Sequence, residues 1–240
     1  MSDLLEKALD AHGGLDLWRS FSSLEADVKA TGALFQFKQQ TEALHDTTVR
    51  IDTRRPHTTF SPIGMPGLRG VFEGDGRVLI ESDAGKVLEQ RPAPRSAMLA
   101  LPADQPWDLM HILYFGGYAQ WNYLSTPFMF TLPGFETREV EPWQEGEETW
   151  RRLHVRFSPD VPTHCAEQTF YFDESGLLRR LDYASEVISS NPAAHYLYDY
   201  AEFSGLRMAT RRKALRRNPD GTAAPEPVFV GIEYTDIRLS

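Results

Sequence analysis

Short segments that alternate apolar and polar residues fill most of this chain, and Gly- and Asp-containing turns separate them. They run from Leu24 to Pro92 and resume from Phe135 to Leu239, with Leu206–Arg216 as a clear example. Alternation with a period of two is typical of antiparallel strands that have one buried face. Roughly a dozen such strands in one sheet curl or close, because wide twisted sheets rarely stay open and flat. We therefore expect a mainly β fold with a strongly curved antiparallel sheet that forms an incomplete barrel.

Two stretches depart from this pattern and are predicted to be helical. An N-terminal helix should end at His12-Gly13-Gly14, because glycine readily adopts the left-handed conformation that ends helices. An interior insert at about residues 95–125 begins rich in Pro and Ala and continues into an aromatic run. We expect the insert to form a helical lid over the concave side of the sheet. No low-complexity linker or repeat divides the chain, so residues 1–240 are expected to form a single domain.

Composition excludes several classes of protein. The net charge of −9 argues against nucleic acid as the main partner, since phosphate binding requires a basic surface. The sole cysteine, Cys165, excludes an intrachain disulfide. The most apolar stretch, residues 107–132, is interrupted by polar residues, Pro127 and two glycines, so we expect no integral membrane segment. The first residues have neither the basic start nor the apolar run of a secretory signal, and we expect a cytoplasmic protein.

Two segments carry a resemblance to a known family. The first is Ala11-His12-Gly13-Gly14-Leu15 with Trp18, followed at once by strands, and the second is the predicted hairpin Gln168–Tyr183. With this order of elements, the chain resembles the LolA/LolB-like superfamily of outer-membrane lipoprotein carriers, and also a group of bacterial cytosolic proteins of this length. The resemblance implies a half-barrel whose hydrophobic cavity binds a lipid-like or other apolar ligand. The carriers are exported, whereas this sequence shows no export signal.

Aromatic residues concentrate in and just beyond the interior insert. Tyrosine and tryptophan combine a large apolar surface with a polar tip, which suits the wall of a ligand cavity. The same residues could equally form plain core, and both interpretations stay open. The adjacent Gly116 and Gly117 permit either close packing or a flexible lid. The candidate ligand-binding aromatic residues are Trp107, Tyr114, Phe115, Tyr118 and Trp121.

Polar residues on the predicted strands provide candidates for chemistry. His164 and Gln168 fall on one face of a strand, and His195 and Arg212 lie on two later strands. Facing the cavity, these groups could fix a ligand or perform acid–base chemistry near neutral pH. Satisfied core or rim histidines are the alternative interpretation. The candidate catalytic residues are His164, His195, His111 and Asp108, and Gln168 and Arg212 join the candidate ligand-binding residues.

No motif supports a metal or a nucleotide cofactor. Asp108 with His111 suits a helix, but two ligands do not make a metal site. The sequence contains no HExxH, GxGxxG or P-loop pattern, so we expect neither metal nor cofactor. The basic run from Arg207 to Arg217 is interpreted as a solvated segment paired with acidic neighbours.

The sequence therefore favours binding of a hydrophobic small molecule or lipid-like ligand in the concave cavity of a half-barrel. The alternative is a cofactor-independent enzyme (a cyclase, isomerase, lyase or hydrolase) that acts on an apolar substrate through His and Asp residues. A third possibility is an interaction module that uses its sheet edges and aromatic insert. No sequence feature specifies an oligomeric state.

Overall fold

The computed structural model describes residues 2–240 and confirms the mainly β prediction. Its strands have the following bounds: β1 Ser23–Thr31, β2 Thr47–Asp52, β3 Thr58–Ser61, β4 Leu68–Glu73, β5 Arg77–Ser82, β6 Val87–Pro92, β7 Glu136–Glu145, β8 Glu148–Arg156, β9 Glu167–Phe172, β10 Leu178–Ser185, β11 Asn191–Phe203, β12 Leu206–Arg216 and β13 Val230–Leu239.

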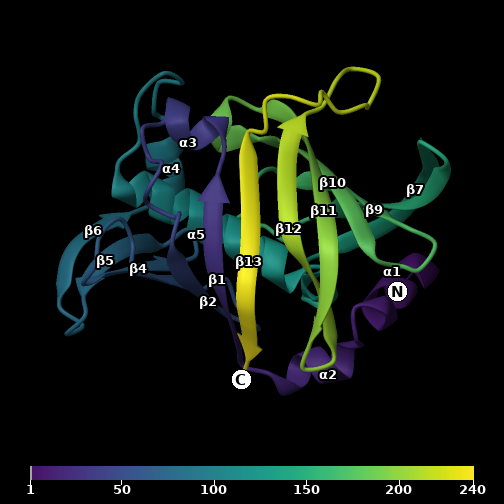
Figure 1. Cartoon of the computed structure of the whole chain (residues 1–240), viewed down its shortest axis with the longest axis horizontal. Helices are drawn as coiled ribbons and strands as arrows, with labels where there is room; N and C mark the ends of the chain where they lie inside the picture. Colours follow the sequence, from purple (N-terminus) through teal and green to yellow (C-terminus); the bar gives the residue numbers. More distant parts are fainter. Residues whose placement is uncertain (1) are drawn as a thin grey trace.

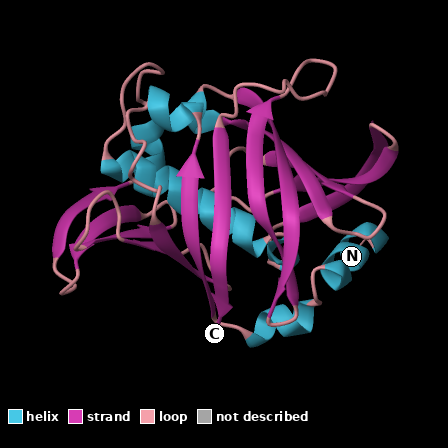
Figure 2. Ribbon diagram, viewed as in Figure 1, coloured by secondary structure: helices cyan, strands magenta, loops and turns pink. Residues whose placement is uncertain are grey.

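All of these strands belong to one antiparallel sheet in the order β6-β5-β4-β3-β2-β1-β13-β12-β11-β10-β9-β8-β7. The order is that of two meanders, β1–β6 and β7–β13, joined where the first strand pairs with the last. The sheet curves strongly without closing, since β6 and β7 remain at opposite edges (Figures 1 and 2). The predicted incomplete barrel is thereby confirmed.

The helices gather at the ends and on the concave side of the sheet (Figure 2). Their bounds are α1 Asp3–Ala11, α2 Leu15–Ser20, α3 Ala33–Phe37, α4 Pro94–Leu99 and α5 Leu109–Ser125, with the short 3-10 helices η1 Phe128–Thr131 and η2 Glu186–Ile188. None of the helices within residues 2–240 has the length and apolarity that crossing a membrane requires.

Helix α5 connects the two meanders and fills the concave side of the sheet. The chain leaves β6 at one edge and enters β7 at the other, so its connection has to cross the sheet. Seventeen residues at 1.5 Å each give α5 a length of about 26 Å. Its buried residues extend around the whole helix, because β2–β5 pack on one side and the segment around Pro162 and His164 contacts another. The insert is therefore an interior helix of the half-barrel.

The two adjacent glycines of α5 serve close packing. A Cβ added at Gly117 would overlap the Cβ and ring of Phe72 on β4, and one at Gly116 would lie 2.8 Å from a methyl of Leu44. The hydroxyl of Thr58 on β3 donates to the carbonyl of Gly117 over 2.9 Å. At Gly117, helix and sheet thus approach more closely than a larger residue would allow.

One expectation from the sequence is wrong. Phe35 and Phe37 alternate with polar residues as strand residues do, but they lie in the short helix α3. The N–H groups at the start of α3 donate to the carbonyls of Val228 and Phe229, which precede β13. Gly32, with a φ of +122°, packs directly against the Phe229 carbonyl. A contact with a distant segment therefore sets the local structure.

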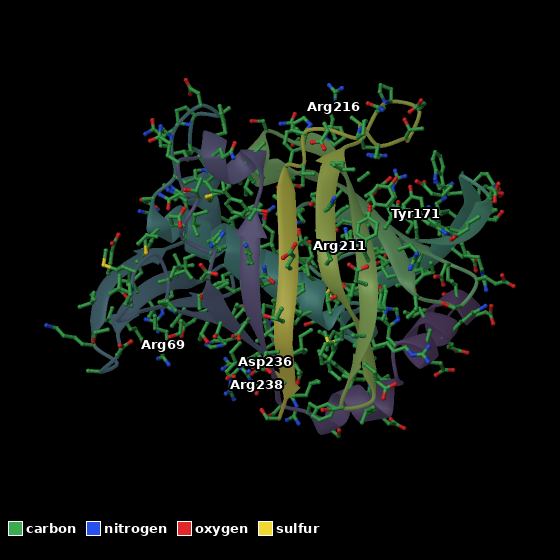
Figure 3. The ribbon with its side chains drawn as sticks, in the orientation of Figure 1. Arg69, Tyr171, Arg211, Arg216, Asp236 and Arg238 are labelled. Atoms are coloured by element: carbon green, nitrogen blue, oxygen red, sulfur yellow. The ribbon has the colours of Figure 1, made fainter. Side chains whose placement is uncertain are left out.

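The outer face of the sheet carries a buried cluster around Arg180 of β10. Its guanidinium donates to both carboxylate oxygens of Asp182, over 2.6 and 2.9 Å, and lies over the rings of Trp143, Tyr171 and Tyr196. Figure 3 shows Tyr171 in this region, and Arg211 on β12 and Arg238 near the end of β13 elsewhere on the same outer face. Two of its contacts, Trp143 and Glu145, belong to β7, so the cluster connects β7 with β10.

Candidate ligand-binding cavity

A cavity of about 540 Å³ opens at the end of the half-barrel where α3 and the β10–β11 connection meet. This volume is ordinary for a small-molecule site. Most of its lining side chains are apolar, and they come from α3, α5, the β10–β11 hairpin, β12 and β13. The lining residues are Ala33, Leu34, Phe37, Ala103, Asp104, Phe115, His164, Tyr183, Ser185, Ile188, Ser189, Asn191, Pro192, Ala193, Ala214, Phe229 and Val230.

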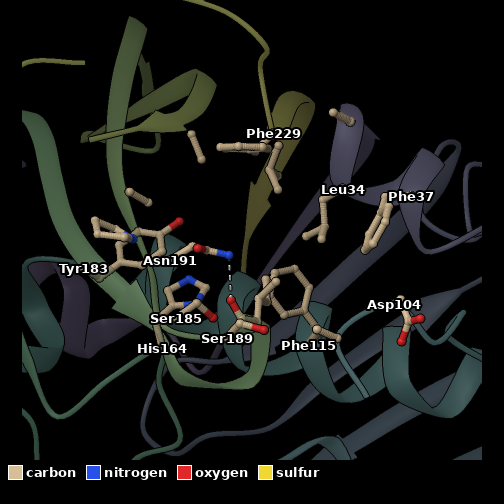
Figure 4. A pocket seen from close by; sticks show the side chains of 17 residues that line it. Leu34, Phe37, Asp104, Phe115, His164, Tyr183, Ser185, Ser189, Asn191 and Phe229 are labelled. Carbon is tan, nitrogen blue, oxygen red and sulfur yellow. Dashed lines mark hydrogen bonds between the residues drawn. The ribbon is translucent and has the colours of Figure 1, made fainter. Parts of the chain in front are cut away.

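The cavity has an exposed rim and a buried floor (Figure 4). Phe37 and Asp104 on one side and Ser189 and Asn191 on the other are exposed and define the rim. His164, Tyr183 and Ser185 are buried and gather at one end, whereas Leu34 and Phe115 form the opposite wall. A ligand that enters past Phe37 therefore meets apolar walls first and polar groups last.

His164 is the centre of a buried network of hydroxyl groups at this floor. Its Nδ1 lies 3.0 Å from the hydroxyl of Tyr118 and 3.3 Å from that of Ser185. Its Nε2 lies 2.8 Å from the hydroxyl of Tyr123. The imidazole also stacks on the ring of Tyr183, with centroids 4.0 Å apart. His164 is located in the loop before β9, not on the strand itself, so the predicted strand begins three residues later than its alternation indicated.

Burial keeps this network uncharged near neutral pH. Desolvation, followed by the positive charge of Arg95, lowers the pKa of His164 to about 3. Desolvation also raises the pKa of the Tyr118, Tyr123 and Tyr183 hydroxyls. The floor therefore presents neutral hydrogen-bonding groups, because a charged form would lose its hydration without gaining a partner of opposite charge.

His195 and Arg212 lie in the same interior, beyond Tyr183 and Tyr123. The Nδ1 of His195 is 3.3 Å from the Tyr183 hydroxyl, and its Nε2 is buried without a hydrogen-bond partner. Burial and the charge of Arg212 hold the pKa of His195 well below its usual value. Arg212 donates over 2.8 Å to the carbonyl of Tyr123, in the last turn of α5. A cation there is favourable, because free carbonyls make the end of a helix electronegative.

Of the aromatic residues predicted to bind a ligand, some lie at the cavity and others lie in the core. Phe115 lines the cavity, and Tyr118 supports its floor through His164. Tyr114 donates to Asp75 over 2.6 Å, and the Trp121 ring nitrogen donates to the Asp52 carbonyl over 2.8 Å; neither residue lines the cavity. Trp107 is buried against Phe115 and beside the ammonium group of Lys38.

Asp108, His111 and Gln168 do not line the cavity. The carboxylate of Asp108 accepts from the His111 backbone N–H, and Nδ1 of His111 accepts from the Asp108 N–H, so the pair caps the start of α5. Asp108 also forms an ion pair with Arg91. Gln168 donates to the hydroxyl of Thr163 and the carbonyl of Cys165, which fixes the loop that carries His164. Within residues 2–240, no group of three acidic, His or Cys side chains is arranged to hold a metal.

Ser185, Leu34, Phe37 and Phe229 were not among the residues singled out from the sequence. Ser185 ends β10 directly after Tyr183 and Ala184, so the period of two places it on the same face as Tyr183. That signal was available from the sequence. The contributions of α3 and Phe229 depend on the docking of α3 against the start of β13, which no local pattern encodes.

A second depression of about 590 Å³ lies between α2 and η1. The stacked rings of Trp18 and Phe128 contribute to its lining, and the exposed Arg19 and Arg54 lie at its border. It contains none of the candidate residues, and its buried polar residue, Thr53, already donates its hydroxyl to the carbonyl of Phe21. The cavity at His164 is therefore the stronger candidate site.

Comparison with known proteins shows the fold and no closer relationship. No family model and no curated protein matches the sequence. A LolA superfamily protein from Nitrosomonas europaea has 10% identity and a TM-score of 0.55, covering 97% of this chain and 92% of that one. A DUF1329 family protein from Desulfovibrio piger has 10% identity and a TM-score of 0.54, covering 99% and 94%. An outer membrane lipoprotein-sorting protein domain from Vibrio parahaemolyticus has 9% identity and a TM-score of 0.51, covering 95% and 93%. The half-barrel described here thus has the fold seen in the LolA superfamily.

Proposed function

We propose that this protein binds a hydrophobic small molecule or lipid-like ligand in the cavity between α3, α5 and the β10–β11 hairpin. The observation that carries the proposal is the cavity itself, with about 540 Å³ enclosed largely by apolar side chains. Each apolar group that a ligand buries there gains roughly 25 cal/mol per Å² removed from water. The likeness to a lipoprotein-sorting domain and a LolA superfamily protein supports the same class of ligand.

Binding of the fluorescent apolar probe N-phenyl-1-naphthylamine tests the proposal. Ala193 on β11 lines the cavity, so Ala193→Phe should fill part of it and reduce probe affinity by about tenfold. Ala201 lies on the exposed part of the same strand, and Ala201→Phe is the matched control that should bind normally. Equal binding by both variants, or no binding by the native protein, would contradict the proposal.

Native mass spectrometry of the protein purified from its source gives an independent test. A retained apolar molecule that is absent from Ala193→Phe would identify the ligand directly. Repeated purification without any bound molecule would count against a carrier.

A hydrolase is the enzyme alternative that one contact favours. Ser185 and His164 lie 3.3 Å apart at the cavity floor, as a nucleophile and its base would. However, a histidine with a pKa near 3 is a weak base at neutral pH, and no carboxylate contacts its ring among residues 2–240. If the native protein hydrolyses p-nitrophenyl butyrate and Ser185→Ala does not, the cavity is a catalytic site and the hydrolase replaces the binding protein as the proposed function.

A further inference from the structure

The hydroxyl group of Ser185 retains hydrogen-bonding capacity at the floor of the cavity. Two hydroxyls, those of Tyr118 and Ser185, approach the same Nδ1 of His164. A ring nitrogen of a neutral imidazole offers one proton or one lone pair, so it satisfies one of them well. The Tyr118 contact is the shorter, at 3.0 Å against 3.3 Å. Ser185 lines the cavity while Tyr118 does not. Its hydroxyl has one donor and two acceptor positions, so contacts with His164 and Tyr118 leave a position for a ligand.

The charges around the cavity exclude an anionic end group from this position. The residues that line it include no Lys or Arg, and the single carboxylate, Asp104, lies at the rim. Arg212 is turned to the carbonyl of Tyr123 instead. Arg95, whose charge acts on His164, does not line the cavity and is paired with Glu186. A carboxylate or phosphate at Ser185 would therefore be buried without a cation in contact with it, which is unfavourable. The low pKa of His164 agrees with this, because its imidazole supplies no positive charge near neutral pH.

We propose that the ligand is an uncharged amphiphile, with an apolar body along Leu34, Phe115 and Phe229 and a neutral hydroxyl or carbonyl oxygen bonded to Ser185. This inference rests on the proposed function and names its ligand class. A buried hydroxyl without a partner is unfavourable, so an end group that pairs with it favours binding. Ligands of equal length and different ends should therefore bind with different affinities.

Displacement of N-phenyl-1-naphthylamine at neutral pH by three ligands of equal chain length tests the inference. They are 1-octanol, 1-chlorooctane, which lacks a strong hydrogen-bonding group, and octanoate, which is ionised. Octanoate should bind at least about tenfold more weakly than 1-octanol. Ser185→Ala should weaken 1-octanol binding about fivefold and change 1-chlorooctane binding less than twofold. Ser125→Ala removes another buried hydroxyl, one without a partner and outside the cavity lining, and should change neither ligand.

Two results would overturn the inference while leaving the proposed function intact. One is octanoate binding as tightly as 1-octanol, which requires a cation in the cavity. The other is an unchanged affinity of Ser185→Ala for 1-octanol. Failure of the probe and all three ligands to bind the native protein would instead refute the proposed function itself.

Discussion

The imidazole of His164 lies flat on the phenol ring of Tyr183, with centroids 4.0 Å apart and planes inclined by only 5°. The two residues come from the loop before β9 and from β10, and their contact closes the floor of the cavity. Tyr123 of α5 meets the imidazole with its hydroxyl from the other side. A neutral, stacked and doubly hydrogen-bonded histidine is part of the packing of the half-barrel, so its protonation should be coupled to unfolding.

The free energy of unfolding should fall as the pH is lowered below about 6.5. The unfolded chain protonates His164 near the ordinary histidine value of about 6.5, whereas the folded chain does so only near a pKa of about 3. Between these values the unfolded state holds more protons, so each such histidine lowers stability by about 1.4 kcal/mol per pH unit. His12, with a pKa lowered by burial to about 4, adds to the effect.

Urea denaturation of the native protein and His164→Gln at several pH values between 7 and 5 measures this dependence. The slope of the unfolding free energy against pH should be smaller for the variant, by an amount that corresponds to nearly one proton. This difference is expected whatever the absolute stability of the variant. Identical slopes for the two proteins would mean that His164 titrates normally in the folded state.

Gly117→Ala should destabilise the protein by about 1–3 kcal/mol, because the added methyl overlaps Phe72 in the packed interface between α5 and β4. Gly116→Ala is the matched control, since its methyl meets the flexible end of Leu44 and lies 3.4 Å from the ring of Phe60, which is ordinary contact. The substitution also gains helix propensity worth about 1 kcal/mol. Thermal unfolding followed by circular dichroism compares the two. A Gly117→Ala protein as stable as Gly116→Ala would show that α5 can move away from the sheet.

Local sequence patterns predicted the sheet, because the alternation of a strand and the residues of a turn lie in the same segment as the structure they form. Leu206–Arg216 became β12 with the same bounds, and the insert became the helix that crosses the concave side. The segment around Phe35 failed, because its helical form depends on hydrogen bonds to Val228 and Phe229.

The candidate site was partly within reach of the sequence. His164 and Phe115 were singled out, and both line the cavity. Their meeting with Ser185 and Leu34 depends on the path of a loop and on the docking of α3, which follow from the whole fold. Arg211 and Arg212 are neighbours on β12 and therefore point to opposite faces of the sheet. Arg212 faces inward and donates to the Tyr123 carbonyl, whereas Arg211 pairs with Asp199 on the outside.

The buried pair of Arg180 and Asp182 should behave as a unit. Arg180→Met alone leaves a buried carboxylate with a weaker set of partners and should destabilise the protein by about 3–5 kcal/mol. The double variant Arg180→Met/Asp182→Leu should recover a substantial part of this loss. Arg77→Met, which breaks the exposed pair with Glu73, should cost far less, because water and salt screen exposed charges. Additive losses in a double-mutant cycle measured by urea denaturation would show that the two charges act independently.

Phe37→Ala should weaken ligand binding without weakening the fold. Phe37 lines the cavity mouth with 59% of its surface exposed, so it contributes little to the core but remains available to cover a bound ligand. Loss of that contact should reduce affinity for N-phenyl-1-naphthylamine by about tenfold, since burial of a large apolar side chain contributes about 1.5–3 kcal/mol when complete. Met65 is 58% exposed and lies outside the cavity lining, so Met65→Ala is the matched control. Normal probe affinity in Phe37→Ala would mean that ligands enter and are covered elsewhere, and a lowered melting temperature would mean that the residue stabilises α3 instead.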